Sequence, residues 1–254
     1  MTNTPRKLKD FSDQDGRRYW WHRPEIKYVP PIYAGLDPDE QQLLEDWFEE
    51  TDESLVGECT VPAMSLIHGL VMGSNISSIV QCGHYSGYST LLLGFFLRQM
   101  GAERALFSVD IDPEVTNFTQ RYCNLAGLQQ VVRLRCASSD EPTLTAEAVD
   151  YLGSQPSLVF IDSSHQYQHT LAELNLWWEA LRPGGILLFH DASMFAAQYD
   201  STSNGGVNRA LAEWTSSRDV SAILLNRTVH NHPLSALTYQ DGCGLGILQK
   251  DIDG

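Results

Sequence analysis

Apolar and polar positions along the central part of the chain alternate between two kinds of segment. Short apolar runs, typical of buried strands, are followed by longer stretches in which apolar residues recur every three or four positions, as in helices. The runs lie at residues 79–80, 105–111, 131–137, 157–162 and 186–189, and the helical stretches at 91–97, 114–127, 143–152, 171–181 and 206–214. This alternation predicts an α/β fold, a mostly parallel sheet with helices on both faces.

The end of the chain departs from this alternation. Residues 222–225 and 244–248 are typical of two more strands, and the stretch between them is rich in turn residues without a helical pattern. We therefore predict a terminal hairpin, with one strand antiparallel to the sheet. Together with the five earlier strands, it completes a Rossmann-like sheet of seven.

The first 34 residues are basic and aromatic, and we expect Pro30-Pro31 to block regular structure there. The aromatic residues are Tyr19, Trp20, Trp21, Tyr28 and Tyr33. We predict that residues 1–60 form an aromatic arm and a helix that cover the site, and that residues 61–254 form the main domain. Three interpretations of the arm stay open: a cover over a pocket, a contact with another subunit, and a passive tail in a surface groove. Helices are expected to start at residues 37–40 and to span 62–72.

Composition narrows the class of protein. The 254 residues are 43% hydrophobic, which suits one globular domain with additions, and the net charge of −15 argues against nucleic acid and anionic membranes as partners. The five cysteines are scattered and several lie in apolar runs, which favours buried free thiols in a reducing compartment. No membrane-spanning run or signal-peptide pattern is present. We therefore expect a cytoplasmic protein with a small-molecule partner, and the aromatic arm suggests a homo-oligomer.

Residues 79–90 read as a strand, a glycine-bearing turn and the start of a helix. Gly83 and Gly87 would let a ligand approach the backbone closely. Tyr85 and Tyr88 stand where a dinucleotide fingerprint needs small residues, so a ligand without a pyrophosphate fits better. An ordinary tight turn is the alternative explanation of the two glycines.

The segment Gly83-His-Tyr-Ser-Gly-Tyr-Ser89 resembles the first motif of class I S-adenosylmethionine (SAM) methyltransferases of the catechol O-methyltransferase type. The resemblance implies that Gly83, Tyr85, Gly87 and Ser89 contact SAM. Relatives usually carry an acidic residue two positions before the first glycine, where this chain has Gln81.

A second block of residues makes the resemblance more specific. Asp162-Ser-Ser-His-Gln-Tyr167, Pro183-Gly-Gly185 and His190-Asp191 resemble a branch that contains macrolide sugar O-methyltransferases and cephalosporin hydroxylase-like proteins. The combined resemblance runs from about residue 60 to residue 250.

Polar side chains follow the predicted strands at the ends where such sheets bind ligands. Asp110 can accept hydrogen bonds from both hydroxyls of a ribose, with Asp112 as the competing candidate, although Asp-Pro often begins a turn. The resemblance places Ser138, with Ser139 as second candidate, beside the adenine. The alternative for these serines is a helix cap.

The resemblance also assigns the chemistry. It implies that Asp162 and Asp191 bind a divalent metal such as Mg²⁺, and that His165 is the general base, with Asp162 also contacting the cofactor. His190 is expected to shape the site rather than bind metal. Ala192 stands where relatives commonly have a second acid or amide, which leaves a two-carboxylate site and a lost site as alternatives.

The predicted function is SAM-dependent O-methylation of a hydroxyl on a small molecule such as a glycoside or polyketide. N-methylation or another SAM-binding reaction on the same fold is one alternative, and a non-catalytic binding protein that retains the fold is another.

Overall fold

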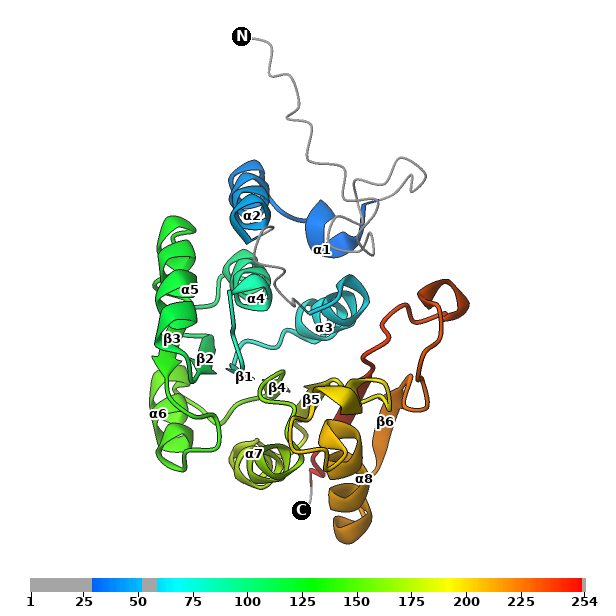
Figure 1. The fold of residues 1–254 in the computed structure, drawn as a ribbon. Coiled ribbons are helices and arrows are strands. Elements are labelled where there is room, and N and C mark those ends of the chain that lie inside the picture. The colour runs from blue at the N-terminus through cyan, green and yellow to red at the C-terminus, as the bar shows by residue number, and fades with distance from the viewer. Residues whose placement is uncertain (1–28, 52–58, 253–254) are drawn as a thin grey trace.

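The computed structural model describes residues 29–51 and 59–252, and its strands form a single sheet (Figure 1). The strands are β1 (Ile79–Cys82), β2 (Leu106–Asp110), β3 (Val132–Cys136), β4 (Leu158–Ile161), β5 (Ile186–His190), β6 (Ala222–Leu225) and β7 (Leu245–Gln249). Their order is β3-β2-β1-β4-β5-β7-β6. Neighbouring strands among the first five in this order, β3, β2, β1, β4 and β5, are parallel. Strand β7 runs antiparallel to both β5 and β6. The predicted seven-stranded sheet with an antiparallel terminal hairpin is confirmed.

Helices cover both faces of this sheet (Figure 1). They are α1 (Pro31–Ala34), α2 (Pro38–Thr51), α3 (Val61–Ser74), α4 (Tyr88–Gln99), α5 (Pro113–Leu125), α6 (Thr143–Leu152), α7 (Tyr167–Ala180) and α8 (Gly206–Arg218), with short 3₁₀ turns η2 (Ala196–Tyr199) and η3 (Leu234–Ala236). Helices α3, α4 and α5 pack on one face with α1 and α2 outside them, and α6, α7 and α8 pack on the other.

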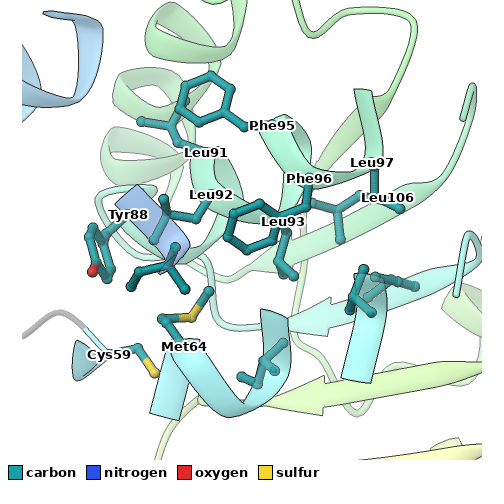
Figure 2. Packing of buried hydrophobic residues seen from close by; sticks show 14 of the residues in the cluster. Cys59, Met64, Tyr88, Leu91, Leu92, Leu93, Phe95, Phe96, Leu97 and Leu106 are labelled. Carbon is teal, nitrogen blue, oxygen red and sulfur yellow. The ribbon is translucent and has the colours of Figure 1, made fainter. Parts of the chain in front are cut away.

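Successive residues of each strand face opposite layers, as the pleat requires. Ile79, Leu106, Leu158 and Leu188 belong to the cluster around α4, whereas Val80, Phe107, Val159 and Leu187 belong to the cluster around α6, α7 and α8. Figure 2 shows part of the first cluster, in which apolar side chains of α4 pack with Met64 of α3 and Leu106 of β2. Because α4 is buried from Tyr88 to Leu97, the turn that precedes it is held in one position.

The N-terminal segment departs from the sequence-based expectation. Pro31 does not block regular structure, because it occupies the first turn of α1, where a missing N–H leaves no hydrogen bond unmade. Ile32 and Tyr33 of this helix are buried in the same cluster as α4. Trp20, Trp21 and Tyr28 lie outside the described residues, so their burial and the boundary at residue 60 stay predictions.

Helix α2 starts at the predicted place through a reciprocal cap. Asp37 Oδ1 accepts the backbone N–H of Glu40 at 2.8 Å, and Glu40 Oε2 accepts that of Asp37 at 3.0 Å. Glu40 also forms an ion pair with Arg98 of α4 at 2.6 Å. The ion pair holds the start of α2 against the last turn of α4, and Trp47 of α2 reaches the turn before α4, where its indole donates to the Ser86 carbonyl at 2.6 Å.

Two details differ from the predicted pattern. Helix α7 buries Trp177 rather than Trp178, and the Trp177 indole donates to the carbonyl of Ser139 at 2.9 Å. Cys59, Cys82 and Cys123 are buried as expected, but Cys136 is exposed; all five cysteines are free thiols. None of the helices within the described residues is both long and apolar enough to cross a membrane.

Candidate active site

A cavity of about 600 Å³ opens at the carboxyl ends of β1, β2, β3 and β4. This is the place where the strand order reverses, because β1 lies between β2 and β4. Nine of the predicted site residues line it: Gly83, Tyr85, Gly87, Ser89, Asp110, Ser138, Ser139, Asp162 and His165. Trp47 and Cys59, which sequence reasoning did not select, line it as well.

Packing requires the two glycines of the turn, and both of them line the cavity. Gly83 has a φ of 86°, and a Cβ on it would lie 1.9 Å from the carbonyl oxygen of Asp162. Gly87 has a φ of 92°, and a Cβ there would lie 2.8 Å from the Thr119 side chain. The tight-turn explanation is therefore confirmed, and the contact of these glycines with a ligand stays a prediction.

Gln81 supports this turn from below. Its Nε2 donates to Ser89 Oγ at 2.7 Å and to the Gly83 carbonyl at 3.2 Å, and its Oε1 accepts from the hydroxyls of Thr90 and Ser108. The side chain is fully buried and does not line the cavity. Gln81 is thus a structural residue, and its Oε1, which already accepts two hydrogen bonds, has no acceptor capacity left for a ligand's ammonium group.

The two candidate aspartates after β2 have separate roles. Asp110 lines the cavity, where its Oδ2 accepts the N–H of Tyr85 at 2.8 Å and its Oδ1 accepts that of Asp112 at 3.0 Å. Asp112 instead caps α5 by accepting the N–H of Glu114 at 2.8 Å. Each carboxylate oxygen of Asp110 retains capacity for a second donor.

The serines after β3 do not cap α6, because the N-cap position is occupied by Pro142 and there is no side-chain cap hydrogen bond. Ser138 and Ser139 both line the cavity, and Ser139 is also hydrogen-bonded to buried Glu173 and to His169 Nε2 at 2.9 Å. Sequence reasoning missed Glu173 and His169. A glutamate in the apolar stripe of a helix indicates a buried polar partner, but the sequence does not show that this partner is Ser139.

The loops after β4 and β5 bring His165, Asp162 and Asp191 together. His165 Nε2 lies 2.9 Å from Asp191 Oδ2 and 4.0 Å from Asp162 Oδ1. Both His165 (φ 59°) and Asp191 (φ 61°) adopt the left-handed backbone conformation, which is rare away from glycine and marks an over-determined local structure. Burial lowers the pKa of His165, but the Asp191 hydrogen bond and nearby carboxylates raise it to a value above 6.5.

His190 lies among three carboxylates. Its Nδ1 is 3.4 Å from Asp162 Oδ1 and 3.3 Å from Asp191 Oδ2, and its Nε2 is 3.3 Å from Asp241 Oδ2. Burial opposes protonation of His190, yet the surrounding charges, Asp191 foremost, raise its pKa well above the ordinary value. Burial likewise opposes ionisation of Asp191, but His190 and His165 lower its pKa.

Ala192, where relatives commonly have an acid or amide, is fully buried in the apolar cluster on the α8 side. Its backbone rather than its side chain makes the polar contacts, with Gly244 and Asn208. The ligand atoms of Asp162, His165 and Asp191 lie within 4.8 Å of one another without a contribution from residue 192.

Comparisons with known proteins agree with the observed fold. Residues 80–192 match the model of a methyltransferase domain family. Three solved structures illustrate the likeness in fold. An O-methyltransferase from Bacillus cereus in complex with SAH (S-adenosylhomocysteine) is 17% identical, with a TM-score of 0.61 over 85% of this chain and 92% of its own. The Podospora anserina methyltransferase PaMTH1, bound to SAH, is 16% identical, with a TM-score of 0.61 over 85% and 89%. The O-methyltransferase TomG from Streptomyces achromogenes, in complex with SAM, is 18% identical, with a TM-score of 0.58 over 85% and 91%.

A comparison with curated protein sequences found no significant match. At these identities the solved structures show only that the fold is shared. The family model shows a match to a methyltransferase domain. Residues 80–192 therefore match the methyltransferase domain that the sequence predicted, and the chain has the Rossmann-like fold of the similar methyltransferase structures.

Proposed function

We propose that the protein is a SAM-dependent O-methyltransferase that acts on a hydroxyl of a small molecule, such as a glycoside, a polyketide or another secondary metabolite. The observation that carries the proposal is a single cavity with Asp110 and the glycine turn in its wall and the His165–Asp191 pair at its reactive end. The likeness to the O-methyltransferase from Bacillus cereus with SAH bound and to the O-methyltransferase TomG with SAM bound supports it.

The cavity residues fit SAM. A volume of about 600 Å³ suits a ligand of this size, and Asp110 offers charged acceptors at the end of β2 for the ribose hydroxyls. Ser138 and the Gly83–Ser89 turn complete the wall on either side. When bound, SAM supplies an activated methyl group, and the chain's own residues must then orient the acceptor and take its proton.

His165 is the residue that takes this proton. The Nε2–H of His165 donates to Asp191, which keeps a proton on that nitrogen and leaves Nδ1 to accept the proton of the acceptor hydroxyl. The side chain lines the cavity and is one-third exposed, so an acceptor can reach it. Asp191, with 5% of its side chain exposed, is too deeply placed to meet the acceptor itself.

A divalent ion at Asp162 is the remaining part of the proposal, because a bound ion lowers the pKa of a hydroxyl that it contacts. Asp162 lines the cavity and lies near Asp191, and two carboxylates suit Mg²⁺. An ion shared by this pair would have to compete with His165, whose Nε2 already lies 2.9 Å from Asp191 Oδ2.

Turnover of His165→Ala tests the proposal. SAH formation from SAM, measured with a panel of hydroxylated glycosides and polyphenols, should fall by about 10²–10⁴, the usual contribution of a general base. Added imidazole should restore part of the rate in this variant, and SAM affinity should not change. The exposed His230 supplies the control variant His230→Ala, which should keep the wild-type rate.

Three other outcomes would contradict parts of the proposal. Turnover with amines alone would favour N-methylation, and SAM binding without turnover on any acceptor would favour a non-catalytic role. If EDTA leaves turnover unchanged, the reaction needs no divalent ion, and His165 alone takes the proton.

A further inference from the structure

Cys59 and His190 lie beside the His165–Asp191 pair and have no part in the proton transfer proposed above. Cys59, which immediately precedes the N-cap of α3 and is labelled in Figure 2, is buried and lines the cavity. Its Sγ, a carboxylate oxygen of Asp162 and a ring nitrogen of His190 all lie within 4.8 Å of one another. A thiol, a carboxylate and an imidazole thus converge on one point at the cavity wall.

The far side of the His190 ring is held by a buried carboxylate. His190 Nε2 faces Asp241 Oδ2 at 3.3 Å, and within the described residues neither atom makes a well-aligned hydrogen bond. Asp241 is fully buried and is fixed by the N–H of Cys243, which donates to Oδ1 at 3.0 Å. A carboxylate behind an imidazole is the usual arrangement that orients a metal-binding histidine. It leaves Nδ1 directed toward Asp162, 3.4 Å away.

We propose that Cys59, Asp162 and His190 bind a borderline divalent ion of the zinc class, with Asp241 as the residue that orients His190. Sulfur and nitrogen donors select such ions, whereas Mg²⁺ prefers oxygen alone. Three protein ligands leave a fourth position open toward the cavity, as in catalytic zinc sites. The proton of the Cys59 thiol and the proton on His190 Nδ1 both pass to solvent when the ion binds, because metal ligands must be deprotonated.

This site leaves the His165–Asp191 pair intact. An ion between Asp162 and Asp191 would have to displace His165, whereas an ion on the Cys59 side of Asp162 uses groups that the proton transfer does not need. The surrounding carboxylates of Asp162, Asp191 and Asp241 make the position negative, which favours a dication. Only the ion's role beside the acceptor hydroxyl rests on the proposed function, and ion binding itself does not.

Titration of the chelator-treated protein with Co²⁺ tests the proposal, because a cobalt–thiolate bond absorbs in the near ultraviolet by charge transfer. The wild type should develop this band at one equivalent of Co²⁺. Zn²⁺ should abolish the band by displacement, and excess Mg²⁺ should leave it unchanged. Cys59→Ser should lose the band. Asp241→Asn should keep it but bind Co²⁺ about 10–100-fold more weakly, as expected for a residue that orients a ligand.

Cys136→Ser is the matched control, since Cys136 is an exposed thiol that does not line the cavity, and its band should match the wild type. A band that persists in Cys59→Ser, or Co²⁺ binding without any band, would overturn the proposal and point to an all-oxygen site. If Cys59→Ser loses its native circular dichroism, the Asp241→Asn result decides, and unchanged Co²⁺ affinity there overturns the proposal. SAM binding and turnover are measured on the same samples, so a protein that binds Co²⁺ as expected but fails with SAM contradicts only the proposed function.

Discussion

Asp110 fixes the glycine turn and faces the cavity with the same carboxylate. Its oxygens accept the backbone N–H groups of Tyr85 and Asp112, which ties the turn after β1 to the end of β2. Because these two bonds use only part of the carboxylate's acceptor capacity, the same side chain can bind ribose hydroxyls. At the residue scale, the two backbone N–H groups therefore hold the Asp110 carboxylate in the position from which it would contact the cofactor.

Replacing Asp110 by alanine should weaken the binding of SAM and SAH by about 1–3 kcal/mol through lost charged hydrogen bonds. Asp112→Ala is a close control, since Asp112 lies two positions away, caps α5 and does not line the cavity. It should lower stability and leave SAM affinity nearly unchanged. Isothermal titration of both variants measures this difference. Equal losses in the two variants, or tight NAD binding by the wild type, would refute the assignment of Asp110.

Two departures from the family pattern show what the sequence could not decide at this scale. Gln81 stands where relatives usually carry an acid and Ala192 where they commonly carry an acid or amide, and a sequence pattern does not say which way a side chain points. The structure directs both inward, Gln81 into a hydrogen-bond network and Ala192 into an apolar cluster. Cys59 and Asp241 could not be selected either, because each approaches His190 only through tertiary packing.

At the scale of elements, Asp200 joins the starts of two helices. Its Oδ2 accepts the backbone N–H of Gly206 at 2.9 Å, at the start of α8, and that of Tyr167 at 3.4 Å, at the start of α7. Its Oδ1 accepts from the backbone and the hydroxyl of Thr202. Burial opposes ionisation of Asp200, but these hydrogen bonds lower its pKa to about 2. The loop that carries His165 is thereby attached to the loop after β5.

The stability of Asp200→Asn should depend on pH. Because the folded protein lowers this pKa, the ionised carboxylate stabilises the fold above the ordinary pKa of about 4, and this contribution disappears as the pH falls toward 2. At pH 7 the variant should lose about 1–3 kcal/mol of unfolding free energy, a loss that shrinks at low pH. Urea unfolding at several pH values measures it, and Asp219→Asn, at the C-cap of α8, should stay within about 0.5 kcal/mol of the wild type. A deficit independent of pH would show that the charge of Asp200 is unimportant.

Element boundaries were predictable wherever apolar periodicity reached them. Helix α6 spans the predicted residues 143–152, because its buried positions continue to its ends. Helix α7 begins at Tyr167, four residues before the predicted start at Leu171, because its first turn is held by polar contacts that leave no apolar pattern. The loops at the strand ends, which carry the site, are where periodicity gives least information.

At the scale of the whole molecule, the terminal hairpin brings Asp241, which is distant in the sequence, to the His190 side chain. His190 of β5 pairs with Leu245 of β7, and the pairing continues as Ser193 donates to the carbonyl of Cys243 at 2.8 Å. This antiparallel continuation carries Asp241 past the end of β5 and against the His190 ring. The hairpin was predictable from its two apolar runs, but the position of Asp241 follows from the register, which the sequence does not specify.

Helix α1 allows a test at the same scale, because it belongs to the core although it precedes the predicted domain boundary. Ile32 is fully buried, and the hydroxyl of Tyr33 is hydrogen-bonded to that of Tyr88, a cavity residue, at 2.5 Å. A truncation that removes residues 1–34 should therefore unfold more easily than one that removes residues 1–28. The difference in unfolding free energy should be at least that of Ile32→Ala alone, about 2–5 kcal/mol. The longer truncation should also bind SAH more weakly, because Tyr88 loses its partner Tyr33 at the cavity wall. Urea unfolding and SAH titration of the two truncated proteins measure both effects. Equal stability and equal SAH affinity would mean that residues 29–34 only lie on the core and do not support it.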